Sequence, residues 1–234
     1  FSTPSETNLL TPSDITGGVF TDLQYQLDAV KMALKAIENH SGVIIADVVG
    51  LGKSIIGSTV AKNLGLRTII VCPPHLKQQW EEYKDEFKFT ASVFSSGKIS
   101  DALDHYRHIA QPNEKFLIVV DEAHKYKNEF IQDYSILHDL CMDNKVMLLT
   151  ATPFNNRPED IFSMLKLFQV PNKSTLKTVD NLGTAFKELI SNYKELAEAQ
   201  RNNKITPEEV KAEANKIAKK IRSIISPLVV RRSR

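Results

Sequence analysis

The most informative segment of the chain reads VIIADVVGLGKS and spans residues 43–54. Its first four residues are an apolar run typical of a buried strand, and residues 54–64 are compatible with a helix. Between them lie Gly50 and Gly52, which would let backbone N–H groups approach an anion with no Cβ in the way. A strand, a glycine-containing turn and a helix in this order predict a phosphate-binding loop.

The residues of this loop indicate how it would work. The Lys53 ammonium would reach the β and γ phosphates of a nucleotide, and the Ser54 hydroxyl would hold Mg²⁺. The general pattern has a glycine where this chain has Asp47. The alternative is a glycine-rich turn that caps a helix beside an exposed lysine. The residues predicted to bind the phosphates are Gly50, Leu51, Gly52, Lys53 and Ser54.

A second segment, LIVVDEAH, spans residues 117–124. Its four apolar residues place Asp121 and Glu122 at the carboxyl end of a strand, where ligands of open α/β sheets bind. Asp121 would lie just outside the ligands of Mg²⁺ or coordinate the ion through water, and Glu122 would orient and deprotonate the attacking water. The alternative is a charged helix N-terminus, where acidic residues are favourable in any case. The upstream phosphate loop favours the catalytic interpretation.

A third segment, MLLTATP, spans residues 147–153. Hydroxyl groups at Thr150 and Thr152 again follow an apolar run, and they could hydrogen-bond to groups around the two carboxylates. An ordinary turn at the end of a strand is the alternative. The order of the three segments, each directly after a predicted strand, favours one shared site.

Short apolar runs alternate with helical stripes along most of the chain, which predicts an α/β fold with a mostly parallel sheet covered by helices on both faces. The expected strands are 43–46, 68–72, 92–94, 116–120 and 146–150, and the expected helices are 23–37, 54–64, 76–87, 99–110, 130–137 and 158–168. Trp80, Tyr83 and Phe87 follow the helical period, so we interpret them as core residues in preference to a base-stacking surface.

The two ends of the chain differ from this pattern. Residues 1–18 are rich in Ser, Thr, Pro and Gly and are expected to be loosely ordered. After residue 173, two helical stripes flank a polar break, and the Thr206-Pro-Glu-Glu209 segment has the signature of a helix start. We therefore expect an antiparallel helical hairpin over residues 173–226. Its lysines, Lys216, Lys219 and Lys220, could face DNA or water, and we favour water.

Composition limits the classes of protein that the chain can represent. Lys and Arg number 30 against 28 Asp and Glu, a formal charge of +2, and 42% of residues are hydrophobic, as in a globular protein. No apolar run approaches the roughly 20 residues of a membrane span, and no leader sequence opens the chain. Cys72 and Cys141 lie in apolar stretches and are expected to be buried free thiols. We therefore expect an intracellular protein of the cytoplasm, nucleoid or nucleus.

The three segments together resemble motifs of the first RecA-like lobe of superfamily-two helicases, specifically the Swi/Snf-like branch of double-stranded DNA translocases. The form DxxGLGKS, Asp47 included, resembles that branch's own phosphate loop. Further matches are IVCPPHL at 70–76 to motif Ia, DEAHKYKN at 121–128 to motif II, LTATPFNN at 149–156 to motif III, and PLVVRR at 227–232 to the closing segment of the lobe. The threonine-rich motif Ib of the family has no match between residues 95 and 116.

The resemblance implies roles for further residues. Gln26, in the LQYQ segment at 23–26, would read the edge of the adenine. His124, Thr150 and Thr152 would couple the state of the nucleotide to the DNA. Lys125 and Lys127 could equally contact DNA or water. The DNA-contact candidates, taken from motif Ia, are Pro74, His75 and Lys77.

The resemblance also implies an organisation and an activity. The expected parts are a lead-in at 1–18, a RecA-like P-loop lobe at 19–172, a helical protrusion at 173–226 and a closing segment at 227–234. The second RecA-like lobe, with its arginine finger, is expected outside this chain, so the lobe alone should hydrolyse ATP very slowly. The cofactors would be ATP and Mg²⁺. The partners would be double-stranded DNA, the second lobe and a protein bound by the hairpin, with no membrane.

Other functions are compatible with the same residues. One is a non-catalytic module that binds a nucleotide or a protein partner. Two enzymatic alternatives are the motor subunit of a restriction system and an RNA-remodelling helicase. Stimulation of ATP hydrolysis by duplex DNA would distinguish a motor from a module, and equal stimulation by single-stranded RNA would favour the RNA helicase.

Overall fold

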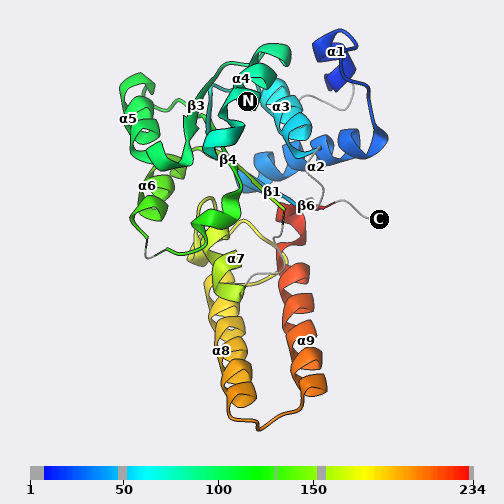
Figure 1. Ribbon diagram of the computed structural model, residues 1–234, viewed down its shortest axis with the longest axis vertical. Coiled ribbons are helices and arrows are strands. Elements are labelled where there is room, and N and C mark those ends of the chain that lie inside the picture. Colours follow the sequence, from blue (N-terminus) through cyan, green and yellow to red (C-terminus); the bar gives the residue numbers. More distant parts are fainter. Residues whose placement is uncertain (1–7, 47–51, 130, 152–156, 232–234) are drawn as a thin grey trace.

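A computed structural model describes residues 8–46, 52–129, 131–151 and 157–231 of the chain. Within these residues, six strands form one sheet in the order β3-β2-β4-β5-β1-β6, and every neighbouring pair is parallel (Figure 1). The α/β class and the parallel sheet predicted from the sequence are thus confirmed. The strands are β1 (Gly42–Ala46), β2 (Thr68–Cys72), β3 (Ala91–Ser95), β4 (Leu117–Asp121), β5 (Lys145–Thr150) and β6 (Val229–Arg231).

The helices of the described residues follow the predicted alternation with the strands. They are α1 (Pro12–Thr16), α2 (Gln24–His40), α3 (Lys53–Leu64), α4 (Lys77–Glu86), α5 (Ile99–Ile109), α6 (Gln132–Cys141), α7 (Pro158–Leu165), α8 (Leu182–Arg201) and α9 (Pro207–Ile225). Short 3₁₀ helices follow three strands: η2 (Pro74–Leu76) after β2, η3 (Ser96–Lys98) after β3 and η4 (Ala123–Tyr126) after β4. Among these helices, none combines the length and the apolar composition that crossing a bilayer requires.

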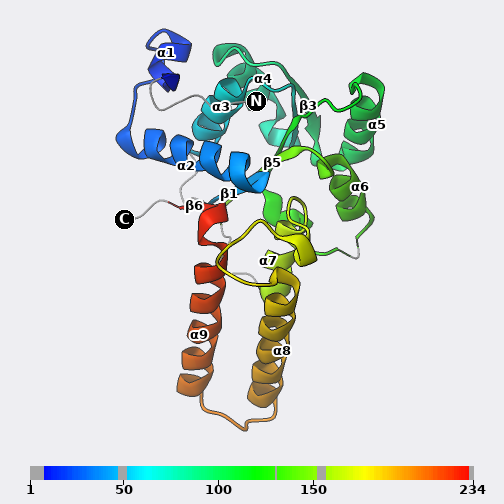
Figure 2. The same cartoon turned by 180° about the vertical axis from the view of Figure 1, so that it is seen from behind.

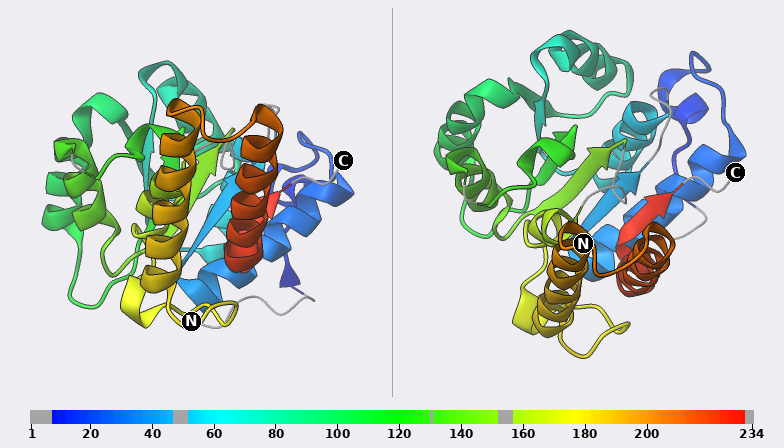
Figure 3. Two further views of the ribbon diagram at one scale, coloured as in Figure 1. Left: turned by 90° about the horizontal axis from the view of Figure 1, so that it is seen from below. Right: turned by 60° about the horizontal axis from the view of Figure 1, so that its bottom comes forward.

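The two faces of the sheet carry separate hydrophobic cores. Because successive side chains of a strand point to opposite faces, Val43 and Ile45 pack with α1 to α4, whereas Ile44 and Ala46 pack with α5 to α9. Figure 3 shows the strands lying between these two groups of helices. All five residues of β1 are buried, as expected for a strand covered on both sides.

Strand β6 is the one strand of the described residues that the sequence did not predict. It contributes three residues, and Val229 and Val230 pair in parallel with Ile44 and Ile45 of β1. Its apolar run is too short to stand out as a strand, and its pairing brings the C-terminal part of the chain back beside β1.

Helices α8 and α9 lie side by side and extend away from the sheet (Figures 1 and 2). Helix α9 begins with the predicted capping box, in which Thr206 and Glu209 each bond to the other's backbone. At the base of α8, Phe186 stacks on Phe162 of α7 with ring centroids 4.9 Å apart. This stacking attaches α8 to the hydrophobic core on the face of the sheet that carries Ile44 and Ala46.

The described part of the N-terminal segment is more ordered than its composition indicates. Thr11 caps α1, and the Asn63 amide bonds to both backbone groups of Leu10. Ile15, within α1, is buried. The short helix α1 therefore packs on α3, although residues 1–18 were expected to be loosely ordered.

Both cysteines are free and buried, as predicted. Burial raises the pKa of the Cys72 thiol to about 12, and the neighbouring Asp121 charge acts in the same direction. The pKa of Cys141 is also raised by burial. Both thiols are therefore protonated and unreactive at neutral pH.

Candidate nucleotide site

The parallel sheet brings the ends of β4, β5 and β1 to one edge, which we call the carboxyl edge. Register places Asp121 beside Leu149, and Thr150 beside Ala46. The polar residues that follow the three strands therefore start from neighbouring positions, although they lie far apart in the sequence. In open α/β sheets, ligands bind at this edge.

Helix α3 starts at this edge with a lysine. Gly52 is the N-cap of α3 and, as a glycine, has no side chain with which to cap the first turn. Lys53 is only 6% exposed, and Ser54 is half-buried. Backbone N–H groups and the positive end of the helix dipole make such a terminus suitable for a phosphate group.

Asp121 is the buried acid of the site, with 5% of its surface exposed. One carboxylate oxygen accepts a hydrogen bond from Trp80 Nε1 at 3.0 Å, and the other accepts one from the Glu122 backbone N–H at 2.9 Å. Burial raises the pKa of Asp121, while these two hydrogen bonds and the Lys53 charge act in the opposite direction. Lys53, at the start of the helix that follows β1, is thus near enough for its charge to act on the Asp121 carboxylate.

Glu122 has a different environment, although it is the next residue. Its backbone is left-handed, with φ 54° and ψ 44°, a conformation that is uncommon for residues other than glycine and occurs often at functional sites. Its side chain is 29% exposed, and a carboxylate oxygen lies 3.2 Å from His124 Nδ1. Glu122 is thus turned out of the core that holds Asp121.

His124 connects the two strand ends. Its Nδ1 faces Glu122 and also lies 3.4 Å from the hydroxyl of Thr150, which is fully buried at the end of β5. The predicted residues Lys53, Asp121, Glu122, His124 and Thr150 are therefore brought together at the carboxyl edge.

The remaining predicted residues lie in other elements or outside the described residues. Gln26 is 3% exposed in the first turn of α2, which packs against α3 and β1. Pro74, His75 and Lys77 are exposed on η2 and at the start of α4, beyond the carboxyl end of β2. The predicted roles of Gly50, Leu51 and Thr152 fall on residues outside the described ranges.

The hydrogen bond from Trp80 to Asp121 was not predicted from the sequence. The structure confirms that Trp80 and Phe87 are core residues, at 1% and 0% exposed, with Tyr83 partly buried beside them. The indole of Trp80 is also a hydrogen-bond donor to Asp121, 41 positions further along the chain. The available signal was chemical, because a buried indole N–H usually has an acceptor, but the sequence did not say which acceptor.

The fold is a RecA-like α/β lobe, in which α3 follows β1 and the Asp121-Glu122 pair lies at the end of β4, with β5 between these two strands. A search of protein families agrees, since the model of the SNF2-related domain matches residues 98–234, more than half of the chain. This chain therefore belongs to the SNF2-related domain family.

Curated relatives of the chain are helicases and remodelling factors. The chain is 31% identical over 169 residues to an uncharacterised ATP-dependent helicase, YqhH, of Bacillus subtilis. The aligned region covers 64% of this chain and 30% of that protein. It is 25% identical over 252 residues to the ATP-dependent DNA helicase DDM1 of Arabidopsis thaliana. That alignment covers 93% of this chain and 31% of that protein. The chain thus spans less than a third of either relative.

A solved structure supports the fold. The Sulfolobus solfataricus SWI2/SNF2 ATPase core, determined in complex with double-stranded DNA, matches 96% of this chain with a TM-score of 0.64 and 20% sequence identity. The match covers 46% of that protein's chain. At this identity the similarity concerns the fold.

Proposed function

We propose that this chain is the ATP-binding lobe of a Swi/Snf-like enzyme that couples ATP hydrolysis to movement along double-stranded DNA. The observation that carries the proposal is the convergence of Lys53, Asp121 and Glu122 at one edge of the sheet. Membership of the SNF2-related domain family supports it. Similarity to a DNA-bound ATPase core supports a fold of the appropriate kind.

The residues present fit a magnesium nucleotide. The first turn of α3 offers N–H groups and a buried cation to the phosphates, and burial raises the pKa of Asp121, so a nearby divalent cation would stabilise its ionised form. Among the described residues, no group of three or more acidic, histidine or cysteine side chains could hold a metal alone. This suits Mg²⁺, which keeps several waters and combines one or two protein ligands with phosphate oxygens.

Each residue then has a defined task. Gly50, Gly52 and Lys53 would hold the phosphates, Ser54 and Asp121 the metal, and Gln26 the adenine. The bound magnesium nucleotide supplies the phosphoryl group that is transferred to water. The Glu122 carboxylate would accept a proton from the attacking water. His124, which also contacts Thr150, would hold Glu122 in place.

The proposed DNA surface begins where β2 ends. Exposed Pro74, His75 and Lys77 lie beyond the same edge of the sheet as the two carboxylates, so DNA bound there would lie close to the nucleotide. Phosphate contacts would supply most of the affinity, which should therefore fall steeply with salt. Lys127 forms an ion pair with Asp160 at 3.9 Å, which favours a structural role for this lysine.

The hairpin over residues 173–226 is proposed as a protrusion that a protein partner could bind. The second RecA-like lobe would be supplied by the rest of the enzyme. Lys216 pairs with Glu213, and Lys220 pairs with Glu188 on the facing helix. These pairs favour a solvated surface over a DNA-binding one for the hairpin lysines.

Replacing Lys53 tests the proposal. Lys53→Ala removes the buried cation, and we expect the affinity for Mg·ATP to fall by about 100-fold or more, the loss expected when a charged contact to phosphate disappears. Isothermal titration calorimetry on the chain measures this. Lys62→Ala is the matched control, because Lys62 lies at the opposite end of the same helix and bonds to the Lys88 carbonyl. Equal affinity in the Lys53 variant and the wild type would contradict the loop assignment.

A further inference from the structure

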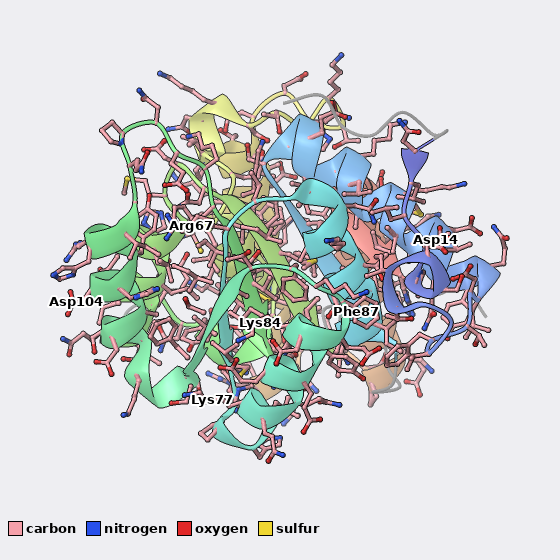
Figure 4. All side chains as sticks on the ribbon, turned by 90° about the horizontal axis from the view of Figure 1, so that it is seen from above. Asp14, Arg67, Lys77, Lys84, Phe87 and Asp104 are labelled. Carbon is pink, nitrogen blue, oxygen red and sulfur yellow. The ribbon has the colours of Figure 1, made fainter. Side chains whose placement is uncertain are left out.

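Trp80 is the only tryptophan of the chain, and it lies where three elements meet. It belongs to α4, one helical turn after the exposed Lys77, and Figure 4 shows Lys77 and Phe87 near the two ends of this helix. Its side chain is 1% exposed, and its Nε1–H donates to the buried Asp121 carboxylate of β4 at 3.0 Å. One side chain thus joins the helix of the DNA-contact candidates to the proposed metal ligand.

The indole also contacts the phosphate-loop helix. A Cβ added to Gly57 of α3 would lie 3.3 Å from Trp80 Cη2, so only a glycine lets α3 approach the indole this closely without displacement. On its other side, Trp80 packs edge-on against Tyr83, with ring centroids 6.3 Å apart. The ring is therefore held between α3 and the aromatic residues of α4, which fixes the direction of its N–H.

Moving this ring would have a consequence at Asp121. Both the indole N–H and the carboxylate oxygen are buried, so separating them leaves a donor and a charged acceptor without each other in an apolar core. A helix is stiff over a single turn, so a shift of the first turn of α4 moves Trp80 as well. Asp121 then has to follow the indole or lose its partner.

We propose that Trp80 is a positioning residue that couples DNA binding at residues 74–77 to the placement of Asp121 for the magnesium nucleotide. The inference rests on the proposed function and adds to it a physical link between the two ligands. Because coupling between two binding sites is reciprocal, DNA would raise the affinity for Mg·ATP, and Mg·ATP would raise the affinity for DNA by the same factor.

Trp80→Phe tests the link, because it retains an aromatic ring and removes the N–H donor. Calorimetry on the chain gives the affinity for Mg·ATP with and without a short blunt DNA duplex. In the wild type we expect the duplex to change this affinity by about 5- to 150-fold, the usual range for coupled sites. In Trp80→Phe the factor should fall to near one, while both ligands still bind.

Tyr83→Phe is the matched control. It also removes one hydrogen-bonding group from an aromatic ring of α4, one turn further along, and it should retain the wild-type factor. A wild-type factor in Trp80→Phe overturns the inference and leaves the proposed function intact. Failure of the wild-type chain to bind Mg·ATP overturns the proposed function, and the inference with it.

Gly57→Ala provides a second variant in case Trp80→Phe does not fold. The added methyl group displaces the indole without removing its N–H group, which disturbs the bond to Asp121, so the coupling factor should fall here as well. Gly97→Ala is its control, because a Cβ at Gly97 meets no heavy atom within 4 Å. Equal coupling factors in the two glycine variants would overturn the inference.

Fluorescence gives a readout that is independent of hydrolysis. Since Trp80 is the only tryptophan, emission excited at the indole band reports on this side chain alone. We expect duplex DNA without nucleotide to shift the emission, and Lys77→Ala to reduce the shift. Lys84→Ala is the control on the same helix, since Lys84 pairs with Glu81. Saturation with DNA and no change in emission would overturn the link.

Discussion

The carboxyl edge and the amino edge of the sheet both bury polar side chains, but of different kinds. At the amino edge, where the strands begin, the Asn144 amide accepts from the Phe116 N–H and donates to the Leu140 carbonyl, each at 2.9 Å. At the carboxyl edge the buried polar groups include the ions Asp121 and Lys53. Neutral amides bonded to backbone groups stabilise a fold, whereas buried ions carry a desolvation cost that a ligand of opposite charge can offset.

Gln169 strengthens the contrast. Its side chain donates to the His40 carbonyl at 2.7 Å and accepts from the Thr175 N–H at 3.1 Å, so it ties α2 to the segment that leads into α8. A cavity of about 530 Å³ lies at the amino edge, and Gln169 is one of the residues that line it. Lys115, Asn144 and Lys145, which also line the cavity, donate to main-chain carbonyls as Gln169 does, so a hollow by itself does not identify the functional edge.

Glu122→Gln should have the largest effect and acts at the carboxyl edge. The amide cannot accept the proton of the attacking water, so turnover should fall by about 10²- to 10⁴-fold, the range for loss of a general base. Steady-state hydrolysis in a protein that carries both RecA-like lobes measures this. Affinity for Mg·ATP should remain close to that of the wild type, and normal turnover would assign the base to another residue.

Asn144→Ala, which acts at the amino edge, should lower the stability of the protein and leave its affinity for Mg·ATP unchanged. It leaves the buried Phe116 N–H and Leu140 carbonyl without their side-chain partner, and we expect the free energy of unfolding to fall by about 2 kcal/mol. Urea unfolding measures the loss, with exposed Asn172→Ala as the control. Affinity for Mg·ATP in the folded variant should not change, and a loss of affinity without a loss of stability would break the contrast between the edges.

Asn181→Ala should have the smallest effect and lies at neither edge. The Asn181 side chain caps α8 by accepting from the Thr184 N–H at 2.8 Å, and removing a cap of this type costs about 1 kcal/mol. Thermal unfolding should show a modest decrease, with nucleotide and DNA binding unchanged. A larger loss than that of Asn144→Ala would mean that the long helices contribute more to the stability of the lobe than the amino edge does.

Much of the fold could be predicted from the sequence, because buried parallel strands leave strong local patterns. Runs such as 69–72 and 146–149 are apolar throughout, and helical stripes separate them. Strand β6 was missed because Val229 and Val230 form too short a run, and only pairing with β1 makes a strand of them. Before α1, the backbone of Leu10 is held by Asn63, which is distant in the sequence.

The site was predictable to the extent that its residues follow strands. Asp121, Glu122 and Thr150 each come directly after an apolar run, so their convergence follows from the parallel sheet. The left-handed backbone of Glu122 was not predictable, because glutamate has no preference for it. The bond from Trp80 to Asp121 was also out of reach, because it depends on how α4 packs on the sheet.

An X-ray structure of the chain with Mg²⁺ and a non-hydrolysable ATP analogue would test whether Lys53, Asp121 and Glu122 serve one ligand. We expect the β-phosphate to lie within hydrogen-bond distance of the first turn of α3, and the metal to lie within one water of Asp121. The γ-phosphate should face Glu122. A nucleotide bound at another surface, with the three side chains unengaged, would contradict the proposed function.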